Sequence, residues 1–286
     1  MIMKNNIGIM QGRLSNAIEN QIQVFPKESW KKEFMVSKQI GFDSIEWIFD
    51  TIEKNPILDD EGIKEIKNIS TKYDVKINSL CADYFMIFKL FDVSDFQLEK
   101  NLDILKKLLN QCSKLGIRIL EIPFVDSSSL KSIRNKAEIV KNLEKSISLV
   151  QDLGMFLTFE TDLAPEEFRE LLLKFNHPNI KANYDIGNST SNGYNTKHEL
   201  EILREWIINI HIKDRILNGH TVPLGKGDAD FNSFFSTLKK IDYKGDLIIQ
   251  GAREDIPESK ISPEETCLRY LNFVKQYLDK YSFSTR

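Results

Sequence analysis

The sequence predicts a single (β/α)8 barrel, and three observations lead to that fold class. Eight short segments rich in β-branched and other apolar residues are spread along the 286 residues. Stretches with helical periodicity separate these segments, and glycine or a helix-capping residue stands at many boundaries. Alternating strands and helices are typical of a parallel sheet with right-handed crossovers, and eight such units in roughly 250 residues or more make a closed barrel.

The predicted strands are short, and several end in a polar or acidic residue. Their composition is that of strands buried on both faces, as in the parallel sheet of an α/β protein. In chain order they are Ile7–Met10, Ser44–Ile48, Lys76–Cys81, Arg118–Ile122, Met155–Glu160, Ile180–Asp185, Ile207–Ile212 and Asp246–Gln250.

The intervening stretches are predicted to be amphipathic helices, because apolar side chains recur every three or four residues. The clearest are Trp30–Ile40, Leu98–Leu115 and Ile139–Leu153. A glycine follows each of these helices, where a C-cap residue belongs, namely Gly41, Gly116 and Gly154. Helix starts are expected at Asp59-Asp60, Ser94 and Ala164-Pro165, which carry capping residues or an early proline.

The alternative architecture is a doubly wound open sheet, which usually has fewer strands. Neither GxGxxG after the first strand nor GxxxxGK[ST] is present, so a nucleotide-binding open sheet loses support. No linker or internal repeat divides the chain, and residues 1–286 are expected to form one domain. Two irregular stretches, Leu14–Ser29 and Ile216–Asp230, are predicted to be long loops on one face of the barrel.

Composition excludes several classes of protein. The net charge is −3 and the basic residues are scattered, so no nucleic-acid partner is expected. Three widely spaced cysteines without a CxxC pair argue against a disulfide framework or a cysteine-rich zinc site. No apolar run reaches the length of a signal peptide or a membrane span, so a cytoplasmic protein with no membrane partner is expected.

Polar side chains at the predicted strand ends carry the functional information, because barrel enzymes place their chemistry there. The ring is mostly acidic, and like charges around one pocket repel each other unless a cation is bound. Its members are Gln11, Arg13, Glu46, Asp83, Glu121, Glu160, Asp185, His211, Gln250 and Arg253.

Four residues of this ring are candidate ligands for one divalent metal ion. Glu160, Asp185, His211 and Gln250 end four successive strands, which lie about 5 Å apart in a sheet. Carboxylate oxygens with one imidazole suit Mn²⁺, Mg²⁺, Co²⁺ or Zn²⁺. Each carboxylate alone is equally consistent with capping a helix or pairing with a lysine, but the set of three adjacent strand ends favours a metal.

Several segments resemble the xylose-isomerase-like TIM-barrel superfamily. The segments FETDL, NYDIGN, NIHIKDR and LGKGDADF carry this resemblance at the later strand ends. GIMQGRLS, FPKESWKKEF and GFDSIEWIFD resemble its sugar phosphate isomerase/epimerase branch. In the epimerase members, glutamates after strands 5 and 8 bind the metal and move protons, with an aspartate and a histidine completing the metal shell. Glu160, Asp185 and His211 match that pattern, and Gln250 departs from it.

The resemblance implies proton transfer next to a carbonyl through an enediolate in a sugar or sugar phosphate, with Glu160 as the catalytic base. Gln250 cannot exchange a proton at neutral pH, which favours isomerisation or syn elimination over inversion by two glutamates. The alternatives are a metal-dependent dehydratase of a keto-polyol, similar to inosose dehydratase, and a non-catalytic sugar-binding barrel. A homodimer or homotetramer is common among proteins of this kind.

The remaining polar groups at the barrel mouth are expected to contact substrate. Lys213 has a second interpretation, as a structural partner for a carboxylate. The loop from Gly225 to Gly227 is either a phosphate site or a plain turn before a helix capped by Asp230, and Glu254 replaces the missing glutamate only if its loop folds back. The expected substrate-binding residues are Gln11, Arg13, Glu46, Asp83, Glu121, Asn188, Lys213, Arg215 and Arg253.

Overall fold

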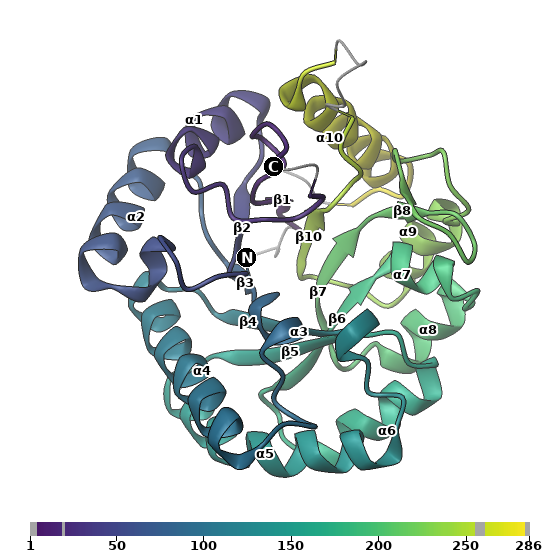
Figure 1. Cartoon of the computed structure of the whole chain (residues 1–286). Coiled ribbons are helices and arrows are strands. Elements are labelled where there is room, and N and C mark those ends of the chain that lie inside the picture. The colour runs from purple at the N-terminus through teal and green to yellow at the C-terminus, as the bar shows by residue number, and fades with distance from the viewer. Residues whose placement is uncertain (1–4, 19–20, 255–260, 284–286) are drawn as a thin grey trace.

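Eight parallel strands close into a barrel in the computed structural model, which describes residues 5–18, 21–254 and 261–283. The order around the barrel is β1-β10-β7-β6-β5-β4-β3-β2, and helices surround the strands (Figure 1). The predicted (β/α)8 barrel is therefore confirmed. The barrel strands are β1 (Ile7–Met10), β2 (Ser44–Ile48), β3 (Ser79–Cys81), β4 (Ile119–Phe124), β5 (Phe156–Thr161), β6 (Ile180–Asp185), β7 (Ile207–Ile212) and β10 (Asp246–Ile249).

The helices begin and end close to the predicted signals. Ser94 caps the 21-residue α4 through its side chain, and Gly41 and Gly116 adopt the left-handed conformation at the ends of α1 and α4. The helices are α1 (Trp30–Ile40), α2 (Asp60–Tyr73), α3 (Tyr84–Ile87), α4 (Asp95–Leu115), α5 (Ile133–Asp152), α6 (Pro165–Phe175), α7 (Ile186–Ser191), α8 (Thr196–Leu203), α9 (Phe231–Lys240) and α10 (Pro263–Lys280).

The structure differs from the prediction mainly at the barrel mouth. Two short helices, α3 and α7, follow β3 and β6 directly, and they are too short to show a helical period. The segment after β7 contains an antiparallel ribbon of β8 (Asp214–Arg215) and β9 (Thr221–Val222) rather than a plain loop. β3 is also shorter than predicted, because Lys76 forms only an isolated bridge with Ser44.

Buried apolar side chains fill the space between the strands and the surrounding helices, with Trp47, Phe34, Phe159 and Phe234 among the largest. Polar side chains are buried at the carboxyl ends of the strands, where the mouth opens. No described helix is both long enough and apolar enough to cross a membrane. The apolar packing makes the barrel a rigid frame for the polar groups at its mouth.

Candidate functional site

Three of the predicted metal ligands meet at the ends of adjacent strands. Glu160 is near the end of β5, Asp185 ends β6 and His211 lies in β7, where it is in register with Asp185. One ligand atom from each residue lies within 4.8 Å of the others. All three side chains are buried. The parallel arrangement brings the three together because the carboxyl ends of neighbouring strands share one edge.

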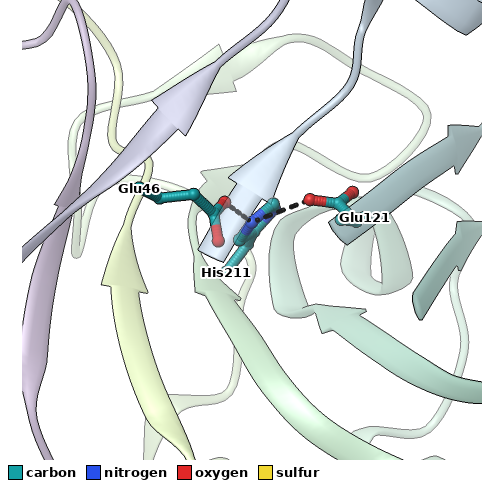
Figure 2. Close-up of side chains that lie close together, drawn as sticks. All are labelled: Glu46, Glu121 and His211. Atoms are coloured by element: carbon teal, nitrogen blue, oxygen red, sulfur yellow. Dashed lines mark hydrogen bonds and ion pairs between the residues drawn. The ribbon is translucent and has the colours of Figure 1, made fainter. Parts of the chain in front are cut away.

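The imidazole of His211 separates two carboxylate groups. Its Nδ1 lies 2.9 Å from Glu160 Oε2, and Glu160 and Asp185 belong to one group with His211. Its Nε2 lies 2.6 Å from Glu46 Oε1 and 3.3 Å from Glu121 Oε2, as Figure 2 shows. Glu46, Glu121 and His211 form a second group whose ligand atoms lie within 4.8 Å of one another. One histidine therefore serves both candidate metal groups, with a different nitrogen facing each.

Glu46 is held as a fixed acceptor for His211. Its Oε2 accepts hydrogen bonds from Ser79 Oγ and, at 2.8 Å, from Asn209 Nδ2. The side chain is fully buried, and it is not among the described residues that line the mouth cavity. A carboxylate at Nε2 keeps the proton on that nitrogen and leaves the Nδ1 lone pair for a metal. The geometry therefore makes His211 the partner of Glu46.

Burial and mutual charge shift the protonation of this cluster. Burial opposes a charged His211, but the facing carboxylates of Glu121 and Glu46 raise the pKa of the imidazole well above its usual value. Burial also raises the pKa of Glu121 well above that of an ordinary carboxyl group. For Glu160, burial is outweighed by His211 and by Lys213, and the pKa is lowered. The cluster thus needs positive charge, from a protonated histidine or a bound cation.

Asp185 is anchored by two neighbours. Its Oδ1 accepts a hydrogen bond from the backbone N–H of Asn188 at 2.8 Å and so caps α7, while Lys213 Nζ lies 2.6 Å from Oδ2. The second interpretation of Lys213, as a partner for a carboxylate, agrees with this ion pair. Asn188 also donates from Nδ2 to Glu160 Oε1 at 2.6 Å, and Arg215 donates to Asn188 Oδ1 at 2.9 Å. The start of α7 therefore holds both carboxylates in place.

A cavity of about 600 Å³ lies at the barrel mouth, and neither Asp185 nor His211 is among the described residues that line it. Glu160 and Gln250 both line it, and Gln250 Oε1 has no hydrogen-bond partner within the described part of the chain. The side chain of Gln250 is buried, and its Nε2 donates to Gln23 Oε1 at 2.8 Å. The other predicted site residues that line this cavity are Arg13, Asp83, Glu121, Asn188, Lys213 and Arg215.

Gln11 and Arg253 were predicted to contact substrate, but the structure places them outside this cavity, where they bind backbone groups. Gln11 Oε1 accepts from the N–H of Ile48 at 3.0 Å. Arg253 donates to the carbonyl groups of Gly12, Ser15 and Ile22. Their positions support a role in holding the loop between β1 and α1.

Glu254 does not fold back into the site. Its carboxylate lies 2.6 Å from Arg269 NH2 and accepts a hydrogen bond from the hydroxyl of Tyr270 at 2.9 Å. Both partners belong to α10, on the outside of the barrel. The structure therefore gives Glu254 no part in replacing the missing strand-8 glutamate.

The phosphate-site interpretation of the loop from Gly225 to Gly227 is wrong. Asp214 Oδ2 accepts from the backbone N–H groups of Gly225 at 2.8 Å and Gly227 at 2.9 Å, and Oδ1 accepts from Ala229 at 3.2 Å. These donors are therefore already occupied by a buried carboxylate. A Cβ at Gly227 would lie 2.2 Å from Asp214 Oδ1, which explains the glycine.

Sequence reasoning missed the amides beneath and beside the site. Asn183 donates from Nδ2 to Glu160 Oε2 at 2.8 Å, and it lies two residues before Asp185. Asn209 lies two residues before His211 in the same way and contacts Glu46. Because side chains alternate along a strand, residues two positions before a site residue face the same interior, and this was the available signal. Gln23 gave no such signal, because it lies in a loop.

Comparison with known proteins places the chain in a family. The sequence model of the xylose isomerase-like TIM barrel matches residues 34–271. The L-ribulose-5-phosphate 3-epimerase UlaE of Salmonella heidelberg (strain SL476) is 24% identical over 233 residues, covering 78% of this chain and 82% of the relative.

Two solved structures share the fold. A D-allulose 3-epimerase from Methylomonas sp. in complex with D-allulose superposes with a TM-score of 0.73 at 18% identity, covering 96% of this chain and 98% of the other. The IOLI protein with a bound zinc atom gives a TM-score of 0.77 at 19% identity, covering 98% and 100%. These structures show the shared fold, and the match of the family model over residues 34–271 shows that the chain belongs to the xylose isomerase-like TIM barrel family.

Proposed function

We propose that this protein is a divalent-metal-dependent isomerase or epimerase that acts on a small ketose or ketose phosphate. The observation that carries the proposal is the convergence of Glu160, Asp185 and His211, with ligand atoms within 4.8 Å of one another, where Glu160 lines a cavity of about 600 Å³. A cavity of this size is in the range that holds small-molecule ligands. The curated relative named above acts on such a sugar phosphate.

The residues at the site fit a divalent cation. Two buried carboxylates, the Nδ1 atom of His211 and the unpartnered Oε1 of Gln250 supply oxygen and nitrogen donors of the kind that Mn²⁺, Mg²⁺, Co²⁺ and Zn²⁺ accept. Glu160, Asp185, His211 and Gln250 would hold the ion. When bound, it supplies Lewis-acid stabilisation of negative charge on the substrate's carbonyl oxygen.

Glu160 is the proposed base for the carbon-bound proton. It lines the cavity, and hydrogen bonds from Asn183 and Asn188 fix both of its oxygens. Because both oxygens are already fixed, Glu160 loses less conformational freedom when it reaches the reactive arrangement with substrate. Gln250 has no proton to give, so Glu160 also returns the proton on the same face of the substrate. This supports aldose–ketose isomerisation in preference to inversion by two glutamates.

The test is turnover in deuterated buffer. Purified protein with Mn²⁺ is incubated with L-ribulose 5-phosphate, D-allulose and related ketoses, and NMR follows deuterium entry next to the carbonyl. Exchange with an aldose or epimer as product supports the proposal, and exchange with loss of water supports the dehydratase alternative. Glu160→Gln is expected to fold normally and to lose exchange. Exchange at the wild-type rate in Glu160→Gln would refute the role of Glu160.

The expected homodimer or homotetramer stays a prediction, and the molar mass of the purified protein by light scattering tests it. A binding-only barrel is tested in the same samples. Sugar binding without any deuterium exchange, in protein loaded with Mn²⁺, would support that alternative and contradict the enzyme proposal.

A further inference from the structure

Gln23 joins Gln250 to Asp83 by hydrogen bonds across the part of the mouth next to β1 and β2. It lies in the loop between β1 and α1, whereas Gln250 follows β10 and Asp83 follows β3. Gln23 Oε1 accepts from Gln250 Nε2 at 2.8 Å, and Gln23 Nε2 donates to Asp83 Oδ2 at 2.7 Å. Arg13 NH2 also donates to Gln23 Oε1, at 3.2 Å. All four side chains line the cavity.

The direction of these hydrogen bonds is fixed at both ends. The guanidinium of Arg13 can only donate, so the atom of Gln23 that faces it must be the oxygen. Asp83 accepts on both oxygens, from Gln23 and, at 3.3 Å, from Cys81 Sγ. Gln23 therefore cannot reverse its amide without losing both partners. Because its oxygen faces Gln250, the atom that Gln250 turns toward it must be Nε2.

This arrangement leaves the oxygen of Gln250 for the site. Gln250 is 6% exposed, and its Oε1 has no hydrogen-bond partner among the described residues. A buried carbonyl without a hydrogen-bond partner is destabilising, and coordination of that oxygen to a cation would remove the destabilisation. The amide would thus offer a bound cation a neutral oxygen and no proton donor.

We infer that Arg13, Gln23 and Asp83 are positioning residues that orient Gln250 so that its Oε1 serves as a neutral metal ligand. The inference rests on the proposed metal-dependent function. It also explains why Gln250 and Gln23 occur together. A glutamate at 250 would present only acceptor atoms to Gln23 Oε1, so the hydrogen bond would be lost.

The experiment is a double-mutant cycle on Mn²⁺ affinity, measured by isothermal titration calorimetry on the purified chain without substrate. We expect Gln250→Ala to weaken binding at least tenfold. Gln23→Ala is expected to weaken it by about tenfold, in the range typical of residues that orient metal ligands. If Gln23 acts through Gln250, the double variant binds no more weakly than Gln250→Ala, within about twofold. Asn16→Ala changes an exposed amide of the same loop that does not line the cavity, and this matched control is expected to leave the affinity unchanged.

A rescue variant separates orientation from general damage to the loop. In Gln23→Glu combined with Asp83→Asn, residue 23 still accepts from Arg13 and Gln250, and the new asparagine donates to it. The net charge is that of the wild type, and we expect Mn²⁺ affinity within about twofold of wild type. Gln23→Glu alone places two carboxylates in contact and is expected to lose thermal stability.

Three results would overturn the inference: wild-type Mn²⁺ affinity in Gln250→Ala, wild-type affinity in Gln23→Ala, or fully additive losses in the double variant. Absence of Mn²⁺ binding to the wild type also overturns it. Failure of the proposed function gives a different outcome. In that case Mn²⁺ binding follows the expected cycle, but no ketose exchanges deuterium.

Discussion

Glu46→Gln tests whether a carboxylate outside the cavity sets the state of the metal-facing histidine. Glu46 Oε2 accepts from Ser79 and Asn209, so the oxygen of a glutamine would take that position. Its NH2 group would then face His211 Nε2, where Glu46 Oε1 lies at 2.6 Å. Two donors cannot share a hydrogen bond. The imidazole would therefore shift its proton to Nδ1, the atom that faces Glu160 and Asp185.

The size of the expected loss in Mn²⁺ affinity follows from the hydrogen bond between Glu46 and His211 that is lost. A bond to a charged group contributes about 1.5–3 kcal/mol, and each 1.4 kcal/mol corresponds to about a tenfold change in affinity. In this variant Nδ1 can bind metal only after the proton has moved back to Nε2. That move is unfavourable, because Nε2 then faces the NH2 group of the new glutamine. Glu46→Gln is therefore expected to weaken Mn²⁺ binding by about 10- to 100-fold, in line with other residues that orient metal-bound histidines.

The assay is competition for Mn²⁺ with a chelator of known affinity, with circular dichroism to confirm folding. Ser79→Ala is the matched control, because it removes a donor to the same carboxylate without placing a donor against Nε2. It is expected to lower stability while changing the Mn²⁺ affinity by less than about threefold. Wild-type affinity in a folded Glu46→Gln variant, or an equal loss in Ser79→Ala, would refute the reasoning about the tautomer.

Three further predictions concern stability, each measured by denaturant or thermal unfolding. Burial raises the pKa of Glu199 to about 7, so between about pH 4.5 and 7 the folded state keeps a proton that the unfolded state releases. The free energy of unfolding therefore falls as pH rises through this window. Glu199→Gln is expected to remove about 3 kcal/mol of that fall. Asp214→Asn sets an NH2 group against the backbone donors of the loop and is expected to cost about 1–3 kcal/mol; unchanged unfolding would contradict this account of the loop. Mn²⁺ at a hundred times its dissociation constant is expected to stabilise the wild type by about 2.7 kcal/mol, and His211→Ala is expected to lose that gain.

The barrel could be predicted because its signals are local and repeated. Hydrophobic runs, helical periods and capping residues each depend on a few neighbouring positions, and Ser94 and Gly116 act as their types predict. The same holds for Glu160, Asp185 and His211, since adjacent parallel strands bring their carboxyl ends together whatever the details of packing. Position along a strand was therefore enough to find these three.

Side-chain partners could not be predicted in the same way, because they depend on which loop covers the mouth. Asp214 directly follows Lys213, a predicted substrate-binding residue, yet it does not line the cavity and accepts hydrogen bonds from the loop that ends at Ala229. Arg253 likewise binds loop carbonyl groups instead of lining the cavity. Gln23 enters the site from a loop with no period at all. The contacts of Arg253 with these carbonyl groups, and of Gln23 with the residue after β10, join residues more than two hundred positions apart and leave no local pattern.

The charges around His211 divide the site into two halves with different tasks. Glu46 is bound by two other donors and accepts from Nε2, whereas burial raises the pKa of Glu121, which favours its neutral form. On the other side, Glu160 and Asp185 face Nδ1 with hydrogen bonds and Lys213 to stabilise their charge. A divalent cation would be bound in this second half, by the two carboxylates and a neutral nitrogen of His211. A neutral Gln250 then adds an oxygen without adding a third negative charge, which leaves Glu160 as the one proposed ligand that also moves a proton.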